Sequence, residues 1–270
     1  MKTRIIAAVA LLPLLLLIVL AAPKVFTAIL FGVMAAIAAY ELLSGTGLVK
    51  NIRLSVYAMV MGFWCSLWSG LELEYSWLLL SILLYWGVLM AEVMKSGMKL
   101  GFRQVALCLV AGVLLPMLLS SLVRIHTWVD GRCFIFVPFL FAFLSDTGAY
   151  FAGLKFGKHK LAPVISPKKT VEGVVGGVAA TILGMVIYCL ILQFAFDMTP
   201  NYFLAVIYGL VGSLTSVFGD LCFSVVKRQT GIKDYGNLIP GHGGILDRFD
   251  SMMLAGPLAE VLLLLIPLAV

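Results

Sequence analysis

Long apolar segments alternate with short polar ones along the whole 270-residue chain. A helix needs about 20 apolar residues to cross the hydrocarbon core of a bilayer. Nine segments approach that length, and they predict nine transmembrane helices, over residues 5–22, 24–43, 53–70, 75–94, 103–123, 132–152, 171–195, 203–226 and 250–269. We therefore expect an all-α polytopic membrane protein.

The composition excludes other classes of protein. Hydrophobic residues make up 62% of the chain and charged residues only 12%, whereas an ordinary soluble domain carries roughly 25% charged residues. The same numbers exclude intrinsic disorder. The five cysteines are widely spaced and lie in or beside apolar runs, so they do not suggest a disulfide framework or a thiolate metal site.

The basic residues predict an orientation. With the N-terminus inside, 16 of the 19 Lys and Arg residues fall in cytoplasmic segments, as the positive-inside rule requires. This pattern predicts an N-in, C-out topology, and it explains the net charge of +6 by contact with anionic membrane lipid and not with nucleic acid. An alternative for residues 5–22 is a cleaved secretory signal, which would leave the sides of the other loops unchanged.

Candidate chemistry gathers at the predicted cytoplasmic face. Two polar segments, residues 153–170 and 227–249, lie there. We expect residues 1–130 to form N-terminal transmembrane helices and residues 131–270 to form the catalytic region of one integral membrane unit, without a separating linker. The active site is expected at the inner ends of the sixth, eighth and ninth helices.

Four aspartates, Asp146, Asp220, Asp247 and Asp250, lie at or near that face. Acids in membrane spans are costly and by default mark a functional site, and their oxygens suit Mg²⁺. Two alternatives stay open. Asp247 and Asp250 can instead charge the start of the ninth helix, and Asp220 can form a buried pair with Lys or Arg.

The segment 224–250 combines groups that bind polyphosphates. Its glycines let backbone N–H groups approach an anion, and its cations supply donors for phosphate oxygens. The candidate residues here are Ser224, Lys227, Arg228, Lys233, His242, Gly243, Gly244 and Arg248. His242 lies between two glycines, with no apolar face to fill, which favours a phosphate contact.

The segment 153–170 adds Ser166, Lys168, Lys169 and Thr170, just before a long apolar helix. Thr170 is a candidate N-cap for that helix, with Glu172 in its first turn. The two lysines would then stand where a helix N-terminus favours an anion. The alternative is ordinary positive-inside charge.

These motifs resemble the signature of the phosphatidate cytidylyltransferase family, the CDP-diacylglycerol synthases. The resemblance rests on the Lys227-Arg228 pair, Lys233-Asp234, His242-Gly243-Gly244 and the closing Asp247-Arg-x-Asp250. Ser145-Asp146-Thr147 and the run from Ser166 to Gly173 also look like the family. The first 100 residues carry little that is diagnostic.

The resemblance implies the reaction of CTP with phosphatidic acid to give CDP-diacylglycerol and pyrophosphate. It implies Mg²⁺, with room for a second, monovalent cation, and a homodimer in the cell membrane. Asp220 and Asp247 would be the principal metal ligands, with Asp146 and Asp250 less secure, and Lys227, Arg228 and Lys233 would contact phosphate.

Three other readings are weaker. A CDP-alcohol phosphotransferase would carry an upstream D-x-x-D-G-x-x-A-R element, which is absent from this sequence. A CTP-dependent polyprenol kinase would release CDP in place of pyrophosphate. A transporter would place its acids near the midplane, where Glu260 is the best candidate.

Overall fold

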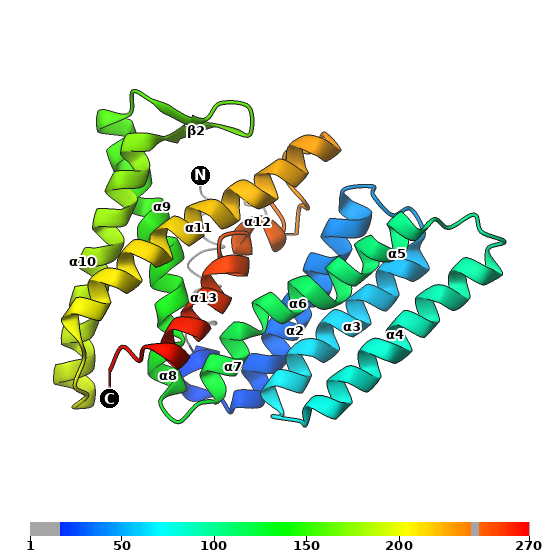
Figure 1. Cartoon of the computed structure of the whole chain (residues 1–270), viewed down its shortest axis with the longest axis horizontal. Coiled ribbons are helices and arrows are strands. Elements are labelled where there is room, and N and C mark those ends of the chain that lie inside the picture. Colours follow the sequence, from blue (N-terminus) through cyan, green and yellow to red (C-terminus); the bar gives the residue numbers. More distant parts are fainter. Residues whose placement is uncertain (1–16, 239–242, 270) are drawn as a thin grey trace. The chain divides into compact units, whose positions relative to one another are not determined.

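The structure is a computed structural model that describes residues 17–238 and 243–269. The described chain is mainly helical and divides into two compact units (Figure 1). The first unit comprises Met1–Val129 with Gln229–Phe249, and the second comprises Asp130–Arg228 with Asp250–Val270. The segment 224–250 is therefore shared between the units. The expectation that residues 131–270 form the catalytic region and residues 1–130 the N-terminal helices stays a prediction.

The helices of the first unit follow the predicted apolar segments closely. They are α2 (Lys24–Tyr40), the π-helical turn η1 (Glu41–Gly45), α3 (Ile52–Gly70), α4 (Tyr75–Lys95), α5 (Phe102–Leu109), the π-helical turn η2 (Val110–Leu114), α6 (Leu115–Leu119), α7 (Ser121–Thr127) and α12 (Leu246–Phe249). Helices α2 and α3 lie side by side. A Cβ on Gly62 would lie only 3.0 Å from Pro116 Cγ, which shows how closely α3 also packs on α6.

The second unit contains α8 (Gly131–Phe134), α9 (Phe136–Phe156), β1 (Lys160–Ala162), β2 (Ser166–Thr170), α10 (Val171–Phe196), α11 (Tyr202–Thr230) and α13 (Met252–Leu265). Helices α9 and α10 form its most extensive contact (Figure 1). Their backbones approach so closely that a Cβ on Gly148 would lie 2.6 Å from the Gly176 carbonyl oxygen. Small residues allow such packing between membrane helices.

A short hairpin departs from the all-helical prediction. Strands β1 and β2 pair antiparallel between α9 and α10, with Lys160 opposite Thr170. Thr170 then caps α10, since its Oγ1 accepts a hydrogen bond from the Gly173 N–H at 3.1 Å. The predicted N-cap is thus confirmed. The hairpin places Lys168 and Lys169, in β2, directly before α10.

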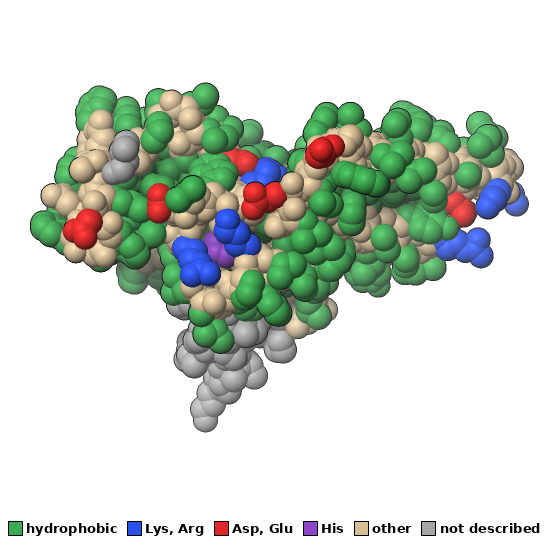
Figure 2. Space-filling view, turned by 90° about the horizontal axis from the view of Figure 1, so that it is seen from below, with side chains coloured by type: hydrophobic (Ala, Val, Ile, Leu, Met, Phe, Trp, Pro, Cys, Tyr) green, Lys and Arg blue, Asp and Glu red, His purple; other side chains and the backbone are tan. Residues whose placement is uncertain are grey.

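Six helical segments among the described residues are long and apolar enough to cross a membrane. They are Lys24–Gly45, Tyr75–Lys95, Phe102–Thr127, Gly131–Phe156, Val171–Phe196 and Tyr202–Thr230. Hydrophobic side chains also dominate the molecular face drawn in Figure 2, and many large ones are exposed, as expected for a surface in contact with lipid. The chain is thus a multi-pass membrane protein.

Nine spans and the N-in, C-out orientation stay predictions. Most of residues 5–22 lies outside the described part of the chain. Helix α3 is not among the six segments, and α13, in the predicted ninth span, has 14 residues. At 1.5 Å per residue α13 is about 21 Å long, which is shorter than the roughly 30 Å hydrocarbon core.

Candidate active site

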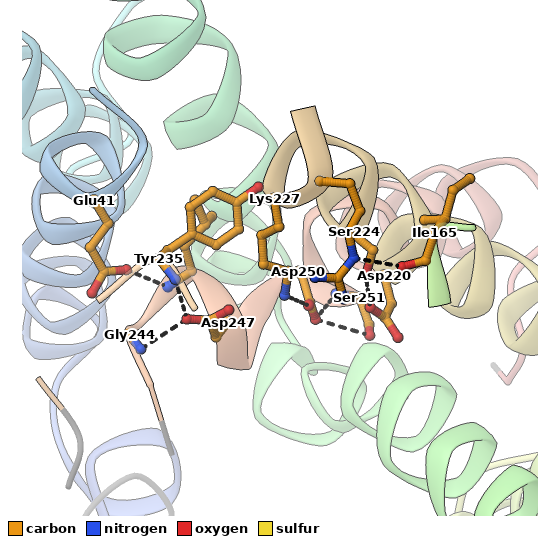
Figure 3. Close-up of polar contacts among 12 residues, drawn as sticks. Glu41, Ile165, Asp220, Ser224, Lys227, Tyr235, Gly244, Asp247, Asp250 and Ser251 are labelled. Carbon is orange, nitrogen blue, oxygen red and sulfur yellow. Dashed lines mark hydrogen bonds and ion pairs between the residues drawn. The ribbon is translucent and has the colours of Figure 1, made fainter. Parts of the chain in front are cut away.

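Helix α11 carries Asp220, which contacts both a lysine and a serine. The Asp220 Oδ2 atom lies 2.6 Å from Lys169 Nζ in an ion pair, and its Oδ1 atom accepts a hydrogen bond from Ser224 Oγ at 3.1 Å. Lys169 comes from β2, so this pair joins the hairpin to α11; Figure 3 shows Asp220 beside Ser224. The carboxylate is partly exposed, which leaves it within reach of a ligand.

A second ion pair involves Asp250, which lies just before α13. Asp250 Oδ2 is 3.8 Å from Lys227 Nζ, and both side chains are about nine-tenths buried. Asp250 Oδ1 also accepts the Ser251 backbone N–H at 2.8 Å. The carboxylates of Asp220 and Asp146 repel the Asp250 carboxylate, and Lys227 partly offsets that repulsion. Asp250 therefore feels the charge of two other acids of the same unit.

The hairpin is tied to α11 and α10 at two further points. Arg228 Nε donates a hydrogen bond to the Ile165 carbonyl oxygen at 3.0 Å. At the other end, the Glu172 carboxylate accepts the backbone N–H groups of Lys158 and His159 and pairs with His159 Nδ1 at 2.6 Å. Glu172 thus stabilises the entry to β1, beyond the first-turn role that the sequence suggested.

In the first unit, Asp247 has different partners. It is buried, and its Oδ2 atom accepts the backbone N–H groups of Tyr235 at 2.7 Å and Gly244 at 3.0 Å. Gly243, with a φ of 85°, provides the left-handed turn before this contact. Asp247 therefore holds the two ends of the segment 235–244 together (Figure 3).

The structure distributes the remaining candidates unevenly. Ser224 is buried near Asp220, and Ser166 opens β2. Lys168, Lys233 and Arg248 have exposed side chains, which suits contact with a soluble substrate. His242 lies outside the described residues. The structure thus brings Asp146, Lys169, Asp220, Lys227 and Asp250 together in one unit, while Asp247 and Lys233 belong to the other.

Sequence reasoning missed Glu41. It lies in η1, is 4% exposed, and accepts hydrogen bonds from the backbone N–H groups of Ile245 and Leu246. Its separation of about 200 residues from those partners hides the contact from any local pattern. The available signal was a lone acid inside an apolar span, which by default marks a function.

The acids of the second unit fit a hard cation in type but do not form a closed cage. No group of three or more His, Cys, Asp or Glu side chains is arranged to hold a metal ion within residues 17–238 and 243–269. Mg²⁺ does not need such a cage, because it usually keeps several waters and binds one or two carboxylates plus substrate phosphates. Asp220 and Asp250 are two carboxylates of this type in one unit.

Comparisons with known proteins agree with the sequence signature. A phosphatidate cytidylyltransferase of Staphylococcus epidermidis is 39% identical over 177 residues, and those of Staphylococcus haemolyticus and Staphylococcus aureus are 38% identical over the same length. Each alignment covers 66% of this chain and 66% of the relative, just under two thirds of its length. The cytidylyltransferase family as a whole matches residues 2–266. The chain therefore belongs to the cytidylyltransferase family.

Proposed function

We propose that this protein is a phosphatidate cytidylyltransferase, which converts CTP and phosphatidic acid to CDP-diacylglycerol and pyrophosphate. The observation that carries the proposal is the pairing of acids with lysines in a unit of membrane-spanning helices, Lys169 with Asp220 and Lys227 with Asp250. The names of the aligned relatives point to the same reaction. As those relatives are bacterial, the cell membrane is the expected location.

The chemistry requires positive charge more than a base. A phosphate oxygen of phosphatidic acid attacks the α-phosphorus of CTP, and the bond from that phosphorus to the β-phosphate oxygen breaks, so that pyrophosphate leaves. The nucleophile is already an anion at neutral pH. The main barrier is the repulsion between two anions, which positioned cations offset as charge develops on the leaving group.

The chain supplies this charge from named side chains. Lys169 and Lys227 are held near the site by Asp220 and Asp250, and each can turn its ammonium group toward a phosphate oxygen. Arg228 already braces the hairpin, and its other guanidinium N–H groups can bind phosphate. Ser224 orients the Asp220 carboxylate.

Asp220 and Asp250, with Asp146 nearby, would hold Mg²⁺. A bound divalent cation would neutralise charge on the attacking and leaving oxygens. The role of Asp247 as a ligand stays a prediction, and so do a second cation and the homodimer. The phosphate contacts of Lys168, Thr170, Lys233, His242 and Arg248 are predictions as well.

We propose that the site faces the cytoplasm, where CTP is dissolved. The support is the concentration of Lys and Arg in the segments that the topology places inside. A lipid phosphate at headgroup level and a nucleotide from water can then meet at the same depth.

The test is a product assay on detergent-purified protein. We expect CTP, phosphatidic acid and Mg²⁺ to give CDP-diacylglycerol and pyrophosphate in equal amounts, with activity lost on chelation by EDTA and restored by added Mg²⁺. Release of CDP with a phosphorylated lipid would indicate a kinase and contradict the proposal. Failure of a monodisperse protein to bind CTP would contradict it as well.

A further inference from the structure

Glu41 is a buried acid whose two carboxylate oxygens are both in use. Oε1 accepts the Ile245 backbone N–H at 3.0 Å, and Oε2 accepts the Leu246 N–H at 2.8 Å. Burying a carboxylate is costly unless its oxygens are paired. Here the pairing falls on the start of α12, whose first N–H groups have no partner within the helix.

Two glycines, Gly236 and Gly244, show how closely the Glu41 carboxylate packs against the segment 224–250. A Cβ on Gly236 would lie 2.6 Å from Glu41 Oε1, and a Cβ on Gly244 would overlap the same carboxylate. Any larger residue at either position would displace Glu41. Gly244 belongs to the His242-Gly243-Gly244 motif and Gly236 lies within the segment 224–250, so the small size of both has a local reason in this chain.

The helix that carries Glu41 is itself fixed against the segment. A Cβ on Gly45, at the end of η1, would lie 2.5 Å from the Tyr235 carbonyl oxygen. Phe31 of α2 meets Phe249 of α12 edge to face, with ring centroids 6.4 Å apart. Along the sequence, Glu41 lies between Phe31 and Gly45, at the start of the π-helical turn η1. Such turns often occur at functional sites.

We propose that Glu41 is a positioning residue for the transferase. It fixes the segment 243–248, and through it the exposed Arg248 and the buried Asp247, in the geometry that the reaction needs. This inference rests on the proposed function. It gives an N-terminal segment, which carries no part of the signature, an indirect role in the rate of the reaction.

The test compares Glu41→Gln with a matched variant, Glu92→Gln. Glutamine has the shape of glutamate, but its amide nitrogen cannot accept a hydrogen bond, so one of the two N–H groups of α12 loses its acceptor. Glu92 is an acid of α4 in the same unit, and within the described part of the chain its side chain accepts one hydrogen bond, from the Tyr57 hydroxyl at 3.2 Å, which glutamine can still accept.

We expect Glu41→Gln to lower kcat about 10- to 100-fold, because small displacements of positioned groups have effects of that size. Hydrogen–deuterium exchange should rise at least about tenfold at Ile245 and Leu246, and stay unchanged in α2 and α3. Glu92→Gln should change neither quantity. A local rise in exchange together with a fall in kcat separates positioning from general destabilisation.

Two results would overturn the inference. One is a Glu41→Gln variant that keeps wild-type kcat while the wild type makes CDP-diacylglycerol. The other is faster exchange throughout the first unit with a lowered unfolding temperature, which would make Glu41 a structural residue only. A wild-type protein that makes no CDP-diacylglycerol would instead contradict the proposed function.

Discussion

The acids of the two units have different main partners. In the first unit, Glu41 and Asp247 each accept two backbone N–H groups from the described residues. In the second unit, Asp220 pairs with Lys169 and Asp250 pairs with Lys227, although Asp250 also accepts the Ser251 backbone N–H. Backbone donors cannot move away from their acceptors without unfolding the segment, whereas a lysine side chain can rotate.

This difference indicates a structural role for the acids of the first unit and a ligand-binding role for those of the second, which we call the working surface. The carboxylates bound to backbone fix the positions of Tyr235 and of residues 244–246, and a ligand that took them would leave buried N–H groups without partners. The carboxylates paired with lysines can exchange that partner for a cation while the lysine moves to a phosphate. We therefore expect changes in the two units to differ in their effect on stability and not only on activity.

The largest effect on activity is expected for Asp220→Asn. The substitution keeps an oxygen for Ser224 but removes the charge that pairs with Lys169 and would bind Mg²⁺. Loss of one such charge should lower kcat/KM about 10²- to 10³-fold, with an unfolding temperature within about 2 °C of wild type. Activity within a few-fold of wild type would remove Asp220 from the proposed site.

Asp247→Ala should lower both activity and stability. It leaves the Tyr235 and Gly244 N–H groups without their carboxylate acceptor, at about 1–3 kcal/mol for each buried donor. We expect a clear fall in unfolding temperature along with about 10- to 100-fold less activity. If Asp247→Ala lost activity at unchanged stability, Asp247 would belong with Asp220 as a working carboxylate.

Lys169→Ala is expected to have a moderate effect. A charge-assisted hydrogen bond contributes about 1.5–3 kcal/mol, so kcat/KM should fall about 10- to 100-fold, near the lower end since Lys169 is partly solvated. The matched control is Lys155→Ala, which removes an exposed lysine from the end of α9. Equal losses in both variants would show that net positive charge matters, and not the position of Lys169.

The smallest effect is expected for Glu172→Gln. This change weakens the contact with His159 but leaves the α9–α10 interface in place, so initial rates should stay within about threefold of wild type. A much larger loss would show that the hairpin entry takes part in substrate binding, and would extend the working surface beyond α11.

The helices could be predicted from the sequence because a membrane span needs only length and hydropathy. The segments at 75–94 and 171–195 match α4 and α10 to within a residue. The hairpin could not, since Ser166–Thr170 contains a proline and two lysines and shows no alternation. Hydropathy likewise gives no sign of the π-helical turn at Glu41.

Residue types alone predicted the chemistry of the candidate site, but they did not predict which residues contact one another. Asp220 does form an ion pair, with Lys169, but both side chains are partly exposed and not buried as the alternative drawn from the sequence supposed; the sequence offered no reason to choose Lys169 over its neighbour Lys168. The bonds from Glu41 to Ile245 and Leu246 join distant parts of the chain, and only tertiary packing brings them together.

The proposed reaction is tested most directly by the fate of the phosphates of CTP. The protein would be supplied with phosphatidic acid, Mg²⁺ and CTP that carries label on either the α- or the γ-phosphate. The account predicts that α-label enters the lipid and γ-label is released as pyrophosphate, in equal amounts. Transfer of γ-label to lipid, with α-label left in soluble CDP, would contradict it.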